Sequence, residues 1–130
     1  HLFCPGDHAS TFGGNPFACT AALTVLNEIK RRNLIQNVFE RGKQLEEGLN
    51  IIADKHQNII KGLRGIGLLQ GIVLKDEITD AKEITLNAFD KRLLVVPAGG
   101  NVVRIVPPLI ISKTEIQSIL SKLSLIFREV

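Results

Sequence analysis

The spacing of the apolar residues changes at Ile59, and this change determines the order of the elements. Before it, residues 16–31 and 34–56 carry apolar side chains at helical spacing, with Asn33 as the break between two helices. After it, residues 59–65 and 68–74 are short apolar runs interrupted by glycine. Such runs are typical of two paired strands, or of one bent strand pair.

Both N-terminal helices are predicted to be amphipathic. The apolar positions of the first helix are Phe17, Ala21, Val25 and Ile29 or Leu26. Those of the second helix are Ile35, Val38, Phe39, Leu45, Leu49 and Ile52. On its other face we expect the charged side chains in solvent, namely Lys43, Glu46 and Glu47.

The glycines of the strand segment follow the order Gly62-x-x-Gly65-x-Gly67. A dinucleotide-binding turn needs its glycines to open a helix, whereas a strand follows them here. We therefore interpret these glycines as positions of β-bulges and of close strand packing.

The C-terminal half mixes helices and short strands. A helix is predicted from a cap at Thr79 or Asp80 to about Lys91, with an inward face of Ala81, Ile84, Ala88 and Phe89. Strands at 93–96 and 102–106 flank a turn at 97–101, and Pro107-Pro108 ends the second strand because proline cannot donate to a ladder. A last helix, capped by Ser112 or Thr114, has on one face Ile116, Ile119, Leu120, Leu123 and Phe127. The predicted fold class is α+β, with a small, mainly antiparallel sheet packed with helices.

Composition excludes several classes of function. The chain has 130 residues and a net charge of +3, and its one tight basic cluster, Lys30-Arg31-Arg32, lies at a helix end. All six aromatic residues are Phe and none alternates with basic residues, so nucleic-acid binding is not expected. No apolar run reaches the length of a membrane span. We expect a soluble, cytoplasmic, globular protein without a membrane partner.

The cysteines and histidines do not form a recognisable metal or catalytic set. Cys4 and Cys19 are far apart and no paired histidines accompany them, so no metal site is expected and the thiols are predicted to be buried. His8 lies beside Asp7 and near Ser10. Catalytic triads are assembled from distant parts of a fold, so these neighbours are not interpreted as one.

Two segments are candidate sites. In the first, Asn15 can cap a helix that Pro16 begins, and Gly13-Gly14 allows a sharply turned loop before it. Ser10 and Thr11 are then displayed beside a helix N-terminus, where a phosphate or carboxylate is favoured. The alternative is a well-capped loop with two ordinary hydroxyl groups.

The second candidate is Arg104, which interrupts the apolar strand Val102–Val106. Alternation places its side chain on the face opposite Val103 and Ile105. A guanidinium in such a strand needs a partner, and its planar fork matches a carboxylate. The alternative is an arginine at the rim that pairs with an acid of the same domain.

Three segments resemble class-III, ornithine-type pyridoxal-phosphate (PLP) aminotransferases. Residues 6–19 are similar to the family's H-x-x-T-[FY]-G-G-N-P-x-[AS] loop, and residues 63–71 resemble its R-G-x-G-L-M-x-G strand. Residues 100–109 are similar to its closing R-x-x-P-P-L motif. Ala9, Phe17 and Leu69 depart from the commonest residues by small changes. Gly100–Arg104 looks most like the members that use N-acetylornithine.

The resemblance implies a fold and roles for the matched residues. The fold would be the small C-terminal domain of a fold-type I PLP enzyme, with residues 1–15 as the tail of the large domain and 16–130 as a helical connection and the small domain. Thr11 would hydrogen-bond the phosphate of the cofactor PLP across a homodimer interface. Ser10 would contact the amino-acid substrate. Arg104 would bind a carboxylate of it, or would pair with a glutamate until a carboxylate arrives.

The resemblance also implies that catalytic residues lie elsewhere. The family's cofactor-bearing lysine precedes the H-x-x-T loop, and neither Lys30 nor Lys43 matches it. We therefore expect a piece of a longer enzyme, inactive by itself, that passes an amino group from N-acetylornithine to 2-oxoglutarate in arginine biosynthesis. The alternatives are a donor such as ornithine, succinylornithine or 4-aminobutyrate, and a non-catalytic module for amino-acid binding or oligomerisation.

Overall fold

The computed structural model describes residues 10–130, which fall into two compact units that divide after Asn33. Each unit is described by itself. Cys4, Asp7 and His8, and with them the start of the loop motif, lie outside the described residues.

The first unit contains helix α1 (Pro16–Arg31). The predicted cap is confirmed, because the Asn15 side chain accepts from the Ala18 backbone and proline occupies the first helical position. None of the apolar residues of α1 is buried, and the Phe17 side chain is 85% exposed. Cys19 is likewise exposed instead of buried. Residues 10–33 contain no second helix or strand that could cover the apolar face of α1.

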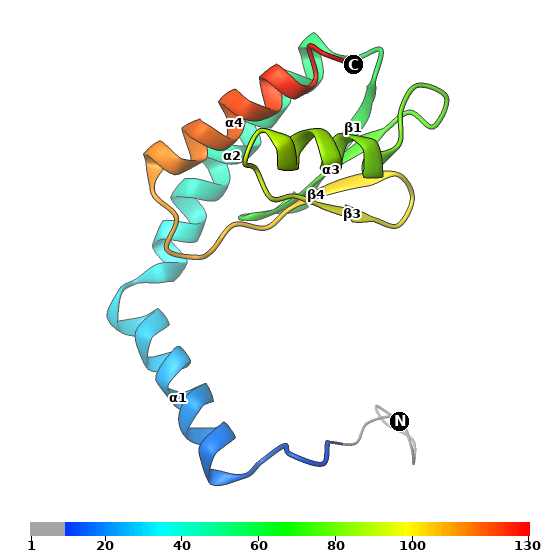
Figure 1. Cartoon of the computed structure of the whole chain (residues 1–130). Helices are drawn as coiled ribbons and strands as arrows, with labels where there is room; N and C mark the ends of the chain where they lie inside the picture. Colours follow the sequence, from blue (N-terminus) through cyan, green and yellow to red (C-terminus); the bar gives the residue numbers. More distant parts are fainter. Residues whose placement is uncertain (1–9) are drawn as a thin grey trace, which may run out of the picture. The chain divides into compact units, whose positions relative to one another are not determined.

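The second unit has three helices and a four-stranded sheet (Figure 1). Helix α2 (Leu34–Lys55) precedes the hairpin of β1 (Ile60–Ile66) and β2 (Leu69–Leu74). Helix α3 (Ala81–Asp90) leads into β3 (Val96–Ala98) and β4 (Val102–Ile105), and α4 (Lys113–Ile126) ends the unit. The strand order is β1-β2-β4-β3, and every neighbouring pair is antiparallel. The predicted α+β class is confirmed.

The core lies between one face of the sheet and the helices. It joins residues of α2, α3 and α4 to inward side chains of the strands, among them Leu45, Ile72, Ile84, Val103 and Leu123. Helices α2 and α4 run side by side, and α3 packs on β3, β4 and α4 (Figure 1). The opposite face of the sheet carries exposed apolar side chains, namely Ile66, Leu69, Val96 and Val106.

Helix α2 buries a narrower stripe than its sequence predicts. Leu45, Leu49 and Ile52 are buried, whereas Ile35 and Phe39 are 67% and 69% exposed. The buried residues recur at alternating steps of three and four, and Ile35 and Phe39 fall to one side of that line. Phe89 of α3 is also exposed, because it lies to one side of the buried face that Ala81, Ile84 and Ala88 form.

Gly62 and Gly65 agree with the predicted bulge and close strand packing, whereas Gly67 lies in the hairpin loop instead. The pairing of β1 with β2 shifts register between Ile60 and Gly62, as a bulge requires. Gly67 opens the two-residue hairpin loop with φ +56°, a conformation that glycine adopts without strain. A Cβ on Gly42 of α2 would lie 2.6 Å from the Gly67 Cα, so two glycines let helix and hairpin approach closely.

The third strand is displaced from its predicted position. Residues 93–95 are not in a strand, and β3 comprises Val96–Ala98, including two residues predicted to be in the turn. Ala98 pairs with Val102, which leaves Gly99, Gly100 and Asn101 as the turn. Pro97 is tolerated because β3 is an edge strand.

The helix caps of the second unit agree with the sequence. Asp80 caps α3, and Ser112 caps α4 with a reciprocal capping box to Glu115. No helix among residues 10–130 is long and apolar enough to cross a membrane.

Candidate functional site

The loop before α1 presents two hydroxyl groups. The Asn15 Oδ1 accepts from the Ala18 backbone N–H at 2.9 Å, and its Nδ2 donates to the Phe12 carbonyl at 2.5 Å. A Cβ on Gly13 would lie 2.7 Å from the Ser10 Oγ, so glycine leaves the space that the serine side chain occupies. Ser10 and Thr11 are both exposed. Their hydroxyl groups are therefore accessible on a loop fixed by the cap.

The helix end itself offers few free amide donors to an anion. Pro16 has no N–H, and Asn15 already accepts from Ala18. An anion at this loop would therefore be held mainly by hydroxyl groups, with a smaller contribution from the helix dipole.

Arg104 lies in β4 with the orientation that the sequence predicts. Val103 and Ile105 are buried in the core, and Arg104 is exposed on the opposite face of the sheet. Its cross-strand partners are Gly71 of β2 and Val96 of β3. The strand thus anchors the backbone of Arg104 rigidly while the guanidinium faces away from the core.

A cavity of about 400 Å³ lies on this open face around Arg104. Its lining comprises Arg64, Gly65, Leu69, Gln70, Gly71, Ala98, Val102 and Arg104. Two cationic groups therefore share a depression with apolar side chains, and no acidic residue lines it. The chemistry of this lining suits an anion with an apolar part, such as an amino-acid carboxylate.

Arg104 forms no ion pair with any acidic group among residues 10–130. Three helical carboxylates have a lowered pKa, and each is explained by hydrogen bonds near it in the sequence. Glu28 is bound by Arg31, Glu40 by Gln36 and Arg41, and Glu115 by Ser112. The alternative of a rim arginine paired with an acid of its own domain thus has no counterpart in the part of the chain that is described.

The turn before β4 is held by a side chain that bridges to α3. The Asn101 Oδ1 accepts from the Ala81 backbone N–H at 2.7 Å, and its Nδ2 donates to the Thr79 carbonyl at 2.9 Å. The Asn101 backbone has φ +54°, which asparagine tolerates better than most residues. These bonds fix the start of the strand that carries Arg104.

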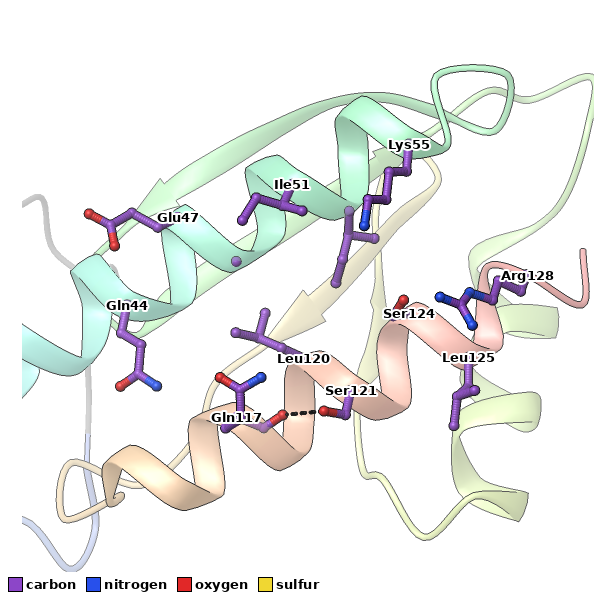
Figure 2. Close-up of a pocket in the computed structure, with 12 residues that line it drawn as sticks. Gln44, Glu47, Ile51, Lys55, Gln117, Leu120, Ser121, Ser124, Leu125 and Arg128 are labelled. Atoms are coloured by element: carbon purple, nitrogen blue, oxygen red, sulfur yellow. Dashed lines mark hydrogen bonds between the residues drawn. The ribbon is translucent and has the colours of Figure 1, made fainter.

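A second and larger cavity, about 580 Å³, lies between α2 and α4. Figure 2 shows Gln44, Glu47, Ile51 and Lys55 on one side and the side chains of α4, with Arg128 after it, on the other. None of the candidate site residues, Ser10, Thr11 and Arg104, lines it. Its charges are mixed, and its polar groups do not converge on one point, so it is the weaker candidate.

The structure places the predicted site residues in two units. Ser10 and Thr11 belong to the first unit and Arg104 to the second. Arg64, Gly71 and Asn101 line or support the Arg104 site, and the sequence assigned no role to them. The feature that marks these residues is the pairing of Gly71 with an arginine on each neighbouring strand. The sequence does not show this pairing, because it depends on the register of the strands. Among residues 10–130 no cluster of His, Cys, Asp and Glu could hold a metal ion.

The sequence of this chain is similar to that of known aminotransferases. The model of the aminotransferase class-III family matches residues 1–127. The acetylornithine aminotransferase of Prochlorococcus marinus subsp. pastoris is 67% identical over 129 residues, which cover 99% of this chain and 31% of that protein. That of Nostoc sp. is 48% identical over 94% of this chain and 29% of its own length. The chain thus spans about a third of the length of these relatives.

The fold of this chain is similar to that of solved aminotransferase structures. The acetylornithine aminotransferase of Elizabethkingia anophelis superimposes with a TM-score of 0.86 at 29% identity, covering 98% of this chain and 32% of that one. The ornithine aminotransferase of Toxoplasma gondii superimposes with a TM-score of 0.85 at 30% identity, covering 98% and 30%.

Proposed function

Because this chain belongs to the class-III aminotransferase family, we propose that it forms the C-terminal part of a cytoplasmic, PLP-dependent aminotransferase. The amino donor is N-acetylornithine and the acceptor is 2-oxoglutarate, as in a step of arginine biosynthesis. The similarity to acetylornithine aminotransferases supports this choice of donor. Residues 1–15 are the end of the large domain, and residues 16–130 are the helical connection and the small domain.

The observation that carries the proposal is the position of Arg104. Its guanidinium lies on the open face of the sheet, in a cavity without acidic groups. Both substrates carry carboxylates, and a bidentate arginine fixes the orientation of such a group as well as binding it. Arg104 therefore holds the substrate carboxylate and orients the chain that ends in the reacting group.

The loop before α1 suits the phosphate of the cofactor. The exposed Thr11 hydroxyl can donate to a phosphate oxygen, and the adjacent helix end favours the negative charge. Ser10 contacts the substrate. In the proposed homodimer, Thr11 serves the cofactor of the partner subunit.

PLP, when bound, supplies the electron sink that amino transfer requires. The lysine that binds it covalently is not matched by any lysine of this chain, so the chain contributes binding and orientation to the reaction. Its own residues hold the anionic groups, and the apolar lining limits water at the bound carboxylate.

The absorbance spectrum of the full-length protein with PLP tests this function. We expect a yellow band that bleaches when N-acetylornithine is added and returns with 2-oxoglutarate. Bleaching with ornithine or 4-aminobutyrate instead would keep the reaction class and change the donor. A protein with no such band would contradict the proposal and favour a non-catalytic module.

A further inference from the structure

Arg104 has a counterpart two strands away. Gly71 pairs with Arg64 of β1 on one side and with Arg104 of β4 on the other. Residues directly opposite in a sheet point to the same face, so both arginines rise from the open face, with the glycine between them. Neighbouring strands lie about 4.8 Å apart, which puts the two Cα atoms roughly 10 Å apart. Arginine side chains are long enough to meet above the glycine.

Gly71 keeps the space between the arginines free. A Cβ at this position would lie 2.9 Å from the Val102 Cγ1 and 3.5 Å from the Arg64 Cγ. Any larger side chain would fill the floor of the cavity that both arginines line. The glycine φ is not in the left-handed region, so backbone conformation does not require it. A glycine at position 71 is therefore explained by the space that it leaves between the two arginine side chains.

Neither guanidinium is neutralised by the described part of the chain. No acidic group among residues 10–130 forms an ion pair with Arg64 or Arg104. Arg64 makes one long hydrogen bond, from its Nη2 to the Gly99 carbonyl at 3.3 Å. A guanidinium has five N–H donors, so most of those of Arg64 remain available. Two like charges in an apolar setting attract an anion strongly.

We propose that Arg64 is a second carboxylate-binding residue, which together with Arg104 holds one substrate carboxylate above Gly71. This inference rests on the proposed aminotransferase function and extends it to a residue that the function did not include. Arg104 supplies the strand-anchored fork, and Arg64 closes over the carboxylate from β1. Its bond to Gly99 keeps the Arg64 side chain near the site when no substrate is present.

The test uses the full-length holoenzyme with two donors, N-acetylornithine and N-acetylputrescine, which lacks the carboxylate. In Arg64→Gln we expect kcat/KM for N-acetylornithine to fall about 10- to 100-fold, mostly through KM, because a charged hydrogen-bond donor is lost. The value for N-acetylputrescine should change less than about twofold, since that donor has no group for Arg64 to bind. Arg64→Lys should recover part of the loss.

The matched control is Lys61→Gln, which removes a cation from the same strand outside the cavity. It should leave both donors unaffected. An equal loss for both donors in Arg64→Gln would assign Arg64 a structural role and overturn the proposal. Unchanged kinetics with N-acetylornithine would overturn it as well.

A second readout does not depend on turnover. Phenylglyoxal modifies accessible arginines, and N-acetylnorvaline, the donor without its reacting amine, serves as the probe. We expect it to protect both Arg64 and Arg104, whereas its uncharged amide protects neither and exposed Arg128 is modified throughout. Protection of Arg104 alone, or of neither, would overturn the arginine pair. If the enzyme lacks transaminase activity and both arginines are protected, the proposed function fails and the anion site stands.

Discussion

At the scale of residues, the proposed binding of a carboxylate depends on where charged side chains lie on the sheet. Arg104 interrupts an apolar strand without disturbing the core, because alternation turns its side chain away from Val103 and Ile105. Its backbone is held by strands on both sides and by the turn that Asn101 fixes. Such a rigid base reduces the entropy lost when the guanidinium binds a carboxylate.

Replacing Arg104 tests its role directly. Arg104→Gln should lower kcat/KM for N-acetylornithine by roughly 10- to 100-fold, as expected for a lost charge-assisted bond. Arg104→Lys should recover only part of this, because an ammonium group cannot bind bidentately. Steady-state kinetics of the full-length enzyme provide the measurement. A kcat/KM within about twofold of wild type for Arg104→Gln would contradict the assignment.

Gly71→Ala tests the space between the arginines. The added Cβ would crowd Val102 and Arg64, so we expect a higher KM for the carboxylate donor. Gly62→Ala is the matched control, since a Cβ at Gly62 of the same hairpin meets nothing within 4 Å. If the two variants have the same KM, the space above Gly71 is not used by substrate.

At the scale of elements, helix caps and close contacts between helices and strands stabilise the second unit. The capping box of α4 joins the Ser112 hydroxyl and backbone N–H to Glu115 Oε2 at 2.7 and 2.8 Å. On α2, two glycines face different neighbours: Gly42 meets the backbone of Gly67, and Gly48 meets the side chain of Leu120. These contacts position α2 against the hairpin and α4 against α2.

The capping box makes stability depend on pH. Hydrogen bonds from the Ser112 side chain and backbone lower the pKa of Glu115 below its ordinary value of 4.5. A lowered folded-state pKa stabilises the fold fully above the unfolded-state value, and this stabilisation is lost as the pH falls through the folded value. Glu115→Gln should therefore cost more stability at pH 7 than at pH 3, as measured by urea unfolding. An equal cost at both pH values would contradict this.

Ser112→Ala removes the cap itself and should destabilise the domain by about 1 kcal/mol. Ser121→Ala is the control, because its hydroxyl bonds only the Gln117 carbonyl within the same helix. Urea unfolding at neutral pH separates the two. Equal stability of the two variants would show that the cap contributes nothing.

The two glycines of α2 should differ in their tolerance of alanine. Gly42→Ala forces the helix away from the Gly67 backbone, which overpacking costs place at about 1–3 kcal/mol. Gly48→Ala meets a leucine that can turn into the neighbouring cavity between α2 and α4 (Figure 2), so its loss should be smaller. Thermal unfolding of the full-length variants gives the comparison. A larger loss for Gly48→Ala would contradict the ranking.

At the scale of the whole molecule, the described chain leaves much apolar surface uncovered. Helix α1 buries nothing, and the open face of the sheet displays Ile66 and Val106 beside the arginines. Large exposed apolar surfaces mark sites of contact with other protein surfaces. The family relatives are about three times as long as this chain, which supports the proposal that these surfaces are covered in a longer enzyme.

The 130-residue chain alone should therefore be inactive and prone to association. We expect no turnover of N-acetylornithine with added PLP, because no lysine of the chain matches the cofactor-binding lysine. Analytical ultracentrifugation should show mass that increases with concentration. Turnover by the purified chain would contradict its assignment as part of an enzyme, and a strictly monomeric chain would contradict the prediction from its exposed surface.

The sequence by itself determined the elements and one side of the site. Local signals sufficed for the helices, the glycine hairpin, the Asn15, Asp80 and Ser112 caps, and the outward side of Arg104, because each depends on residues a few positions apart. The predicted position of the third strand was wrong, because pairing with β4 determines which residues form β3. The predicted burial of Ile35, Phe39 and Phe89 was also wrong, because the position of the sheet determines which side of each helix is covered. Only the tertiary structure brought Arg64, Gly71 and Arg104 into one row. Their juxtaposition depends on the register between strands separated by the whole of α3, which no local pattern specifies.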